Sequence, residues 1–130
     1  MSMFLGSQVN IYADDVDGTV DFYKALGFAE TFRYAPGGEV GHVEVKGAGL
    51  VLGVAAPNII RAEHGLDVSP DGAAMELVLW CEDVESAYRF AIDAGAAAIR
   101  EPHDFQDGRL RVAWIGDPAG NPIQLVQRKD

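Results

Sequence analysis

The sequence predicts an α+β fold made of two tandem β-α-β-β-β modules, and three observations support this. The segment "QVNIYADDV" at residues 8–16 is echoed by "ELVLWCEDV" at residues 76–84, an offset of 76 − 8 = 68 residues. Each copy opens with an alternating polar and apolar run, which is typical of a strand, followed by a helical pattern. Each copy also ends in two alternating runs around a glycine-containing turn, which is typical of a hairpin.

The helix of each copy has matching signals at its two ends. Asp15 and Asp83 precede the helical patterns, where a carboxylate can accept hydrogen bonds from unpaired backbone amides. About three turns later, Gly27 and Gly95 can end the helices in a left-handed conformation. A strand followed by a capped helix is therefore expected twice.

Three more strands are expected after each helix. In the first copy they are "ETFRYA", "EVGHVEVKG" and "GLVLGVAAP", and in the second they are "AAIREP", "GRLRVAWIG" and "NPIQLVQR". Gly49 and Gly120 mark the corresponding turns, but their offset is 120 − 49 = 71 residues. The second copy therefore carries three extra residues, which we expect in the segment "PHDFQDG".

The chain is expected to be one domain spanning residues 1–130. We place module 1 at residues 4–56, a linker at 57–74 and module 2 at 75–130, with a short helix at "NIIRAEHG" in the linker. Each module alone is too small to bury an adequate core, so the two are expected to fold together.

Composition excludes several classes of partner. Twenty acidic against ten basic residues give a net charge of −10, which repels nucleic acid and anionic lipid. The longest apolar run, "GAGLVLGVAAP", is shorter than the roughly 18 residues that span a bilayer, and the first residues lack a signal-peptide pattern. We therefore expect a cytoplasmic protein with no membrane partner. Cys81 is the only cysteine, and in its apolar run it is expected to be a buried thiol without a catalytic role.

The first strand of each copy is expected to present one face to its helix and the other to a cavity. The covered residues of the first copy are expected to be Val9, Ile11 and Ala13 on the strand with Val16, Val20 and Tyr23 on the helix. In the second copy, Leu77, Leu79 and Cys81 should be covered. The open faces would then carry Gln8, Asn10 and Tyr12 in the first copy and Glu76, Val78 and Trp80 in the second.

These features resemble the vicinal oxygen chelate superfamily, which includes glyoxalase I, extradiol dioxygenases, fosfomycin-modifying enzymes and bleomycin-binding resistance proteins. The resemblance rests on "VNIYADDVDGTVDFYKALGF", similar to the family's strand and acid-capped helix, on the repeat, and on "DPAGNPIQLV", similar to its "DPDGN.IEL" ending. It covers nearly the whole chain. It implies the glyoxalase/bleomycin resistance fold, in which paired modules form a cup of curved sheets while the chemistry varies among members.

Metal-dependent members of the family hold their metal at four positions, which correspond here to Gln8, Gly53, Glu76 and Gln124. Divalent cations prefer imidazoles and carboxylates, whereas neutral amides are poor ligands and glycine has no side chain. Only Glu76 is a good ligand, so we expect no metal and no cofactor. The histidines His42, His64 and His103 lie off the mapped positions and are expected to be surface or hydrogen-bonded residues.

Two classes of function remain in competition. The first is metal-free binding of a small aromatic or cationic molecule, as in the bleomycin-resistance branch, at a site formed by Gln8, Asn10, Tyr12, Gly53, Glu76, Val78, Trp80 and Gln124. Tyr12 and Trp80 would form its centre, and the resemblance implies a homodimer. The second is a glyoxalase-type lyase or isomerase with Glu76 as acid or base and a metal held weakly or by residues such as His42 or His103. Glu76 is otherwise expected to be hydrogen-bonded to Gln8 or Gln124, and a pocket filled by side chains would leave a plain scaffold.

Overall fold

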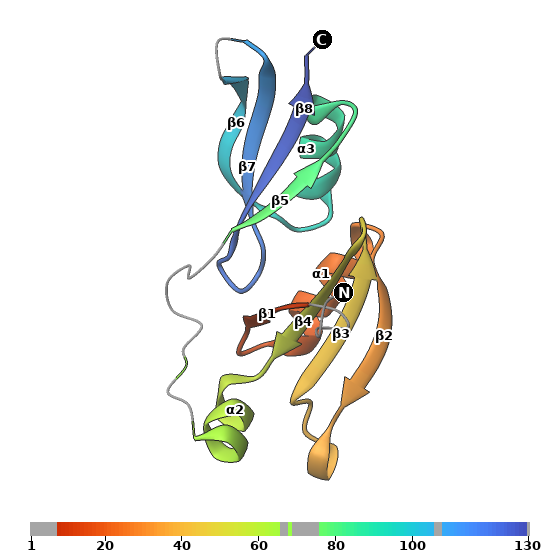
Figure 1. The fold of residues 1–130 in the computed structure, drawn as a ribbon, viewed down its shortest axis with the longest axis vertical. Coiled ribbons are helices and arrows are strands. Elements are labelled where there is room, and N and C mark those ends of the chain that lie inside the picture. Colours follow the sequence, from red (N-terminus) through yellow and green to blue (C-terminus); the bar gives the residue numbers. More distant parts are fainter. Residues whose placement is uncertain (1–7, 66–67, 69–75, 106–107, 130) are drawn as a thin grey trace, which may run out of the picture. The chain divides into compact units, whose positions relative to one another are not determined.

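The computed structural model describes residues 8–65, 68, 76–105 and 108–129. The chain divides into two compact units, Met1–Pro70 and Asp71–Asp130, each with a four-stranded mixed sheet (Figure 1). The predicted α+β class and the two β-α-β-β-β modules are confirmed. Residues 4–7, 66–67 and 69–75 lie outside the described residues, and the predicted module boundaries stay a prediction.

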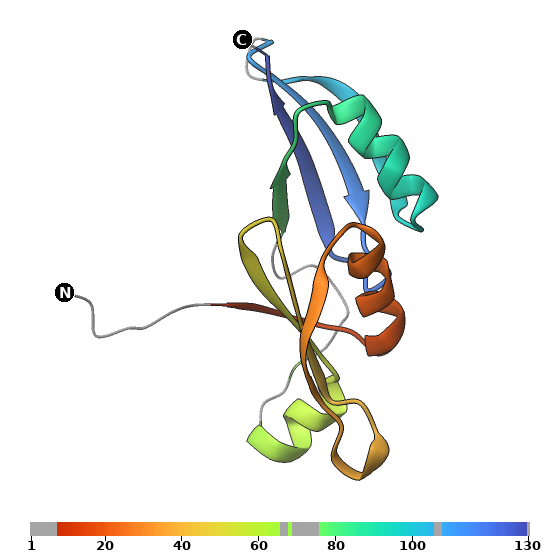
Figure 2. The same cartoon turned by 90° about the vertical axis from the view of Figure 1, so that its right-hand side faces the viewer.

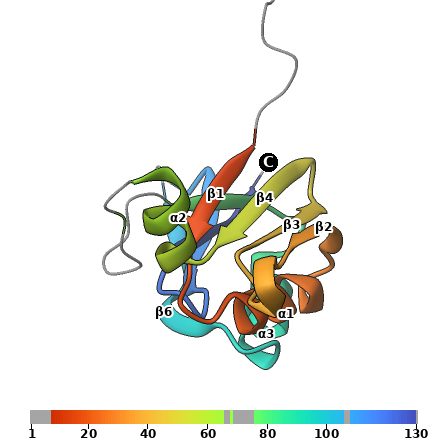
Figure 3. The ribbon, with the colours of Figure 1, turned by 90° about the horizontal axis from the view of Figure 1, so that it is seen from below.

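The first unit forms a sheet in the order β1-β4-β3-β2. β1 pairs with β4 in parallel, whereas the β2–β3 and β3–β4 pairs are antiparallel. Its elements are β1 (Val9–Tyr12), α1 (Val16–Ala25), β2 (Ala29–Tyr34), the 3-10 helix η1 (Pro36–Gly38), β3 (His42–Gly47), β4 (Leu50–Ala55) and α2 (Pro57–His64). The short helix predicted at "NIIRAEHG" is α2, which follows the end of β4 (Figure 3).

The second unit repeats this arrangement in the order β5-β8-β7-β6. Here β5 and β8 form the parallel pair. The elements are β5 (Leu77–Trp80), α3 (Val84–Asp93), β6 (Ala97–Phe105), β7 (Leu110–Gly116) and β8 (Pro122–Arg128). Figure 2 shows α1 and α3 each packed on one face of the sheet of its own unit.

The core of each unit lies between the helix and the covered face of the sheet. In the first unit, the predicted contacts of α1 are confirmed, because Val16, Val20 and Tyr23 are buried. Strand alternation is confirmed as well, since Ile11 and Ala13 are buried whereas Asn10, Val78 and Trp80 are exposed. One face of each sheet is therefore left uncovered by its own helix.

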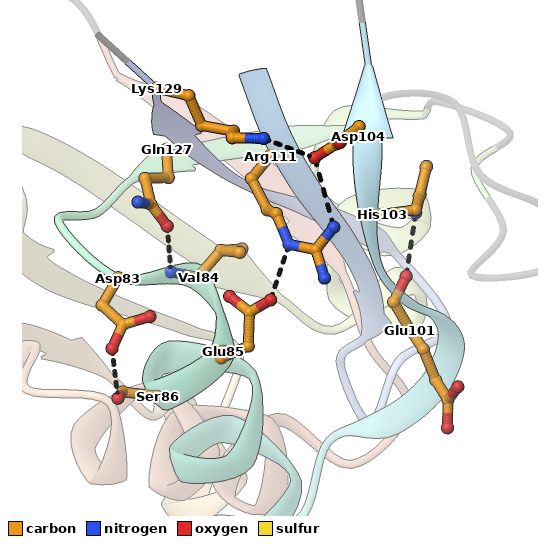
Figure 4. Close-up of polar contacts among 10 residues, drawn as sticks. All are labelled: Asp83, Val84, Glu85, Ser86, Glu101, His103, Asp104, Arg111, Gln127 and Lys129. Carbon is orange, nitrogen blue, oxygen red and sulfur yellow. Dashed lines mark hydrogen bonds and ion pairs between the residues drawn. The ribbon is translucent and has the colours of Figure 1, made fainter. Parts of the chain in front are cut away.

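The two helices begin differently, although both start where the sequence predicts. An Asp15 carboxylate oxygen accepts the Gly18 amide at 2.9 Å, and Gly27, with φ of +106°, follows the end of α1. The Asp83 side chain makes no capping bond of this geometry and accepts the Ser86 hydroxyl at 2.7 Å. This bond, with smaller contributions from the Ser86 and Glu85 amides, holds the pKa of Asp83 below its ordinary value. The first amide of α3 donates to Gln127 Oε1 of β8 at 2.9 Å (Figure 4). A neighbouring strand therefore caps α3.

A charged cluster on the helix side of the second sheet joins α3 to two strands (Figure 4). The Arg111 guanidinium contacts Glu85 at 2.6 Å and Asp104 at 3.2 Å, and Lys129 contacts Asp104 at 3.0 Å. These cations hold the pKa of Asp104 below its ordinary value, Lys129 more than Arg111. The cluster is solvent-exposed, so its contribution to stability is modest and screened by salt.

The three extra residues of the second copy are not all where the sequence predicts. Along one matching row of the two sheets, the offsets are 68, 70 and 71 residues for the pairs Phe32/Arg100, Glu44/Trp114 and Gly53/Gln124. Two extra residues therefore lie between Arg100 of β6 and Trp114 of β7, a stretch in which β6 has an irregularity between Arg100 and His103. The third lies in the β7–β8 turn. Placing all three in "PHDFQDG", part of which lies outside the described residues, was wrong.

Candidate functional site

The open face of the first sheet carries a row of side chains that crosses all four strands. Asn10 pairs with Gly53, Gly53 with Glu44, and Glu44 with Phe32. Paired residues of a sheet lie on the same face. A second row on this face is formed by Tyr12, Ala55, His42 and Tyr34. Residues of β1, β4, β3 and β2 therefore lie side by side on the open face of the first sheet.

Three polar side chains on this face form a connected network around Glu44. Gln8 Nε2 donates to Glu44 Oε2 at 3.2 Å and to Asn10 Oδ1 at 3.0 Å. His42 Nε2 lies 3.0 Å from the same Glu44 oxygen. A carboxylate only accepts hydrogen bonds, so His42 donates from Nε2. The hydrogen bond from His42, together with a smaller contribution from Gln8, holds the pKa of Glu44 below its ordinary value.

Gly53 makes room for this network. A Cβ atom at this position would overlap Asn10 Oδ1 and lie 2.7 Å from His42 Cε1. The side chains of Asn10 and His42 therefore occupy the space that a larger residue on β4 would need. The absence of a side chain at Gly53 is a packing requirement of this face.

A pocket of about 270 Å³ lies between this face and α2. It is lined by Gln8, Asn10, Phe32, Tyr34, Gly41, His42, Ile59, Ile60, Glu63 and His64. The Tyr34 hydroxyl donates to Glu63 Oε1 at 2.8 Å, and this carboxylate raises the pKa of Tyr34. The wall thus combines two amides, four aromatic or imidazole rings and a carboxylate.

The four predicted site residues of the first unit are placed together, although only two line the pocket. Gln8 and Asn10 contribute side chains to its wall. Gly53 lies beneath Asn10, and Tyr12 lies one row further along the same face. The predicted ligand residues of this half are thus neighbours on one surface.

The other four predicted residues lie on the second unit. Val78 pairs with Gln124, which places both on the open face of that sheet, and Glu76 immediately precedes β5. Trp80 is 56% exposed, and the Arg128 guanidinium lies 4.4 Å from its ring centroid. Among the described residues, no hydrogen bond joins Glu76 to Gln124. A ligand site shared by Tyr12 and Trp80 stays a prediction.

Sequence reasoning missed the contributions of β2 and β3 to this site. His42 was expected to lie off the mapped metal positions as a surface or hydrogen-bonded residue; it is hydrogen-bonded to Glu44, and it also lines the pocket. The alternation in "HVEV" carried a usable signal, because residues two apart on a strand share a face. Phe32 and Tyr34 in "TFRY" have the same spacing.

The residues at the family's metal positions do not fit a divalent cation. Gln8 directs its amide nitrogen toward Glu44, and the space beside Gly53 is filled by Asn10 and His42. Neutral amide groups are weak ligands for transition metals. Within residues 8–65, 68, 76–105 and 108–129, no three His, Cys, Asp or Glu side chains are grouped as a metal would require.

No helix in the described ranges has the length and apolar character needed to cross a bilayer.

Cys81, predicted to be buried, is half-buried, and its thiol lies 3.5 Å from the Val126 carbonyl oxygen. Burial is the main cause that raises the pKa of this thiol. A raised pKa disfavours the reactive thiolate.

Comparison with known proteins identifies the family. A superfamily member from Sphaerobacter thermophilus is 26% identical, covering 98% of this chain and 100% of that chain with a TM-score of 0.75. A bleomycin-binding protein complexed with bleomycin is 24% identical, covering 97% of this chain and 100% of that chain with a TM-score of 0.62. Lactoylglutathione lyase from Agrobacterium tumefaciens is 20% identical, covering 97% and 96% with a TM-score of 0.67. The last two likenesses show the fold alone.

Among curated proteins, no match was found. The family model described as Glyoxalase/Bleomycin resistance protein/Dioxygenase superfamily matches residues 7–125. The match includes both predicted strand–helix openings and most of the final hairpin. The chain therefore belongs to the Glyoxalase/Bleomycin resistance protein/Dioxygenase superfamily.

Proposed function

We propose that the protein binds a small aromatic or cationic molecule without a metal, in the manner of antibiotic sequestration. The observation that carries the proposal is the pocket between the open face of the first sheet and α2. Its volume of about 270 Å³ is close to the lower end of the range of roughly 300–1,000 Å³ found for small-molecule pockets.

The pocket wall matches such a ligand chemically. Phe32 is 50% exposed and Tyr34 is 38% exposed, so both rings offer apolar surface that a planar ligand could cover. Aromatic pairs contribute about 0.5–1.5 kcal/mol beyond the burial of area. Glu63 adds a carboxylate at the same wall, and the net charge of −10 attracts cations to the protein.

The predicted residues of the second unit are part of the proposal. Glu76, Val78, Trp80 and Gln124 would extend the ligand surface on the open face of the second sheet. Arg128 already covers one face of the Trp80 ring, so a planar ligand would stack on the other. We also propose a homodimer, as the family resemblance implies, and a cytoplasmic location, in keeping with the short apolar runs of the sequence.

A glyoxalase-type lyase or isomerase is the second candidate function. The observation that favours it is the 3.0 Å contact between His42 and Glu44, because a carboxylate can orient an imidazole for proton transfer. Glu76 is the other candidate acid or base. Methylglyoxal with glutathione should give no lactoylglutathione above background if binding alone is the function. A rate that is lost in His42→Gln or Glu76→Gln would support the enzyme instead.

The binding proposal is tested with planar cationic dyes such as an acridinium, titrated against the protein by dye fluorescence. Saturable binding is expected in the wild type, weakened about tenfold in Phe32→Ala and in Glu63→Gln. Phe90→Ala is a matched control, because Phe90 is an exposed phenylalanine on α3, on the side of the second sheet opposite its open face. Equal binding by all four proteins, or no saturable binding, would contradict the proposal. An excess of chelator should leave the affinity unchanged.

A further inference from the structure

The amide groups of Gln8 and Asn10 have fixed orientations. Glu44 Oε2 can only accept hydrogen bonds, so the Gln8 atom that lies 3.2 Å away must be its amide nitrogen. The same nitrogen lies 3.0 Å from Asn10, whose facing atom must then be its oxygen. The carboxylate therefore determines which atom of each amide faces which partner.

This orientation leaves one acceptor and one donor of the two amides for a ligand. Gln8 Oε1 and Asn10 Nδ2 have no hydrogen-bond partner within the described part of the chain. Both residues line the pocket. A ligand in the pocket is therefore offered a carbonyl oxygen by Gln8, just before β1, and an NH₂ group by Asn10, two residues further on.

The donor and acceptor are also held in place. Gln8 and His42 both donate to Glu44 Oε2, Gln8 from the segment before β1 and His42 from β3. These two hydrogen bonds keep the carboxylate in position. The Asn10 side chain lies over Gly53 in space that a Cβ atom would fill. Polar groups held in this way lose less conformational entropy on binding than free ones.

We propose that the pocket selects planar ligands that carry a cis-amide edge, an N–H beside a C=O as in a lactam, and reads that edge with Gln8 Oε1 and Asn10 Nδ2. The inference rests on the proposed function, because it names the ligand class for the same pocket. Phe32 would stack on the ring that bears the lactam. Glu44 acts as a positioning residue, since it contacts the Gln8 amide and is not part of the pocket lining.

The experiment compares quinolin-2-one with N-methylquinolin-2-one, which keeps the ring and the carbonyl but lacks the N–H donor. Affinities are measured by calorimetry, and ¹H–¹⁵N spectra follow the side-chain amide signals of Gln8 and Asn10. The wild type should bind the N–H compound at least about threefold more tightly, which is the usual scale of one net hydrogen bond. The Asn10 NH₂ signal should move only with ligand bound.

Two variants separate recognition from simple loss of structure. Asn10→Asp removes the donor with little change in size, and it should weaken both compounds. Glu44→Gln releases the Gln8 amide, because a carboxamide can face it with either atom. It should abolish the preference for N–H over N-methyl while both compounds still bind saturably, each more weakly than to the wild type. The same spectra report whether each variant is folded.

The outcomes distinguish this inference from the binding proposal. If the acridinium dye binds through Phe32 but the wild type does not prefer quinolin-2-one to its N-methyl analogue, the lactam inference is wrong and the binding proposal stands. A preference that persists unchanged in Glu44→Gln also overturns it. If neither lactam nor dye binds, both proposals fail.

Discussion

The imidazole of His42 and the carboxylate of Glu44 lie two residues apart on β3 and meet at 3.0 Å between Nε2 and Oε2. Side chains at this spacing point to the same face of a strand. Because the same carboxylate oxygen also accepts Gln8, it joins β3 to the segment that leads into β1. This oxygen therefore organises the polar part of the pocket.

Replacing Glu44 by Gln should change how stability depends on pH. The pKa of Glu44 is lowered in the folded protein below its ordinary value of 4.5, so folding favours the ionised form. That stabilisation is complete above about pH 4.5 and is lost as the pH falls through the folded pKa. Glu44→Gln should therefore be less stable than the wild type at pH 7, and the difference should shrink on acidification. Urea unfolding at pH 7, 5 and 3.5 measures this. A constant difference at all three pH values would contradict it, and Glu82→Gln, at an exposed glutamate, is the control.

Gly53→Ala should destabilise the protein by about 1–3 kcal/mol, the usual range for overpacking. The added Cβ atom would collide with Asn10 Oδ1 and crowd His42. Gly116→Ala is the matched control, because a Cβ atom there has its nearest neighbour at 3.5 Å, an ordinary contact. Thermal unfolding compares the two. The double variant Gly53→Ala/Asn10→Ala should recover part of the lost stability. If it recovers none, the collision with Asn10 is not the cause of the destabilisation.

The helix caps should respond unequally to substitution. Asp15→Ala removes an acceptor from the first turn of α1 and should cost about 1 kcal/mol. Asp83→Ala should cost less than half as much, because the first amide of α3 is bonded to Gln127. Gln127→Ala should instead cost as much as Asp15→Ala. Chemical denaturation measures all three. Equal losses for Asp15→Ala and Asp83→Ala would show that Gln127 does not replace the usual cap.

Purified protein should contain no stoichiometric metal. The mapped residues Gln8, Gly53 and Gln124 are two amides and a glycine, which leaves Glu76 as the one strong ligand of the set. Elemental analysis after purification without chelators measures the content. One equivalent of Zn, Ni, Mn or Fe per chain would contradict the metal-free proposal. Repeating the measurement on Glu76→Gln and His42→Gln would then identify the ligands.

The fold could be predicted from the sequence because its signals are local and occur twice. Asp15 and Asp83 both precede helices, and Gly27 and Gly95 both follow them with positive φ, as short-range sterics require. Strand alternation predicted that Asn10 and Val78 would be exposed. These features depend only on neighbours in the chain.

The pocket depends on pairings between distant segments, and there the prediction was incomplete. Gln8 reaches Glu44 across 36 residues, and Tyr34 reaches Glu63 across 29, through a register that alternation alone does not set. The family resemblance assigned one metal position to each of four strands, and β3 was not among them. His42 and Glu44 were therefore not considered as a pair. Gln127 as the cap of α3 was also missed, because the bond spans 43 residues.

The parallel pairing of β1 with β4, and of β5 with β8, has a consequence for the order in which each unit is built. The β3–β4 hairpin joins residues close in sequence, whereas Val9 pairs with Leu52 and Leu77 with Ile123. Closing such long loops costs more entropy than closing a hairpin, so these contacts form late in folding. We therefore expect the amides of the edge strands β1 and β5 to exchange hydrogen faster than those of the inner strands β3 and β7. The strand that carries Asn10 is thus expected to join its sheet after the β3–β4 hairpin has formed.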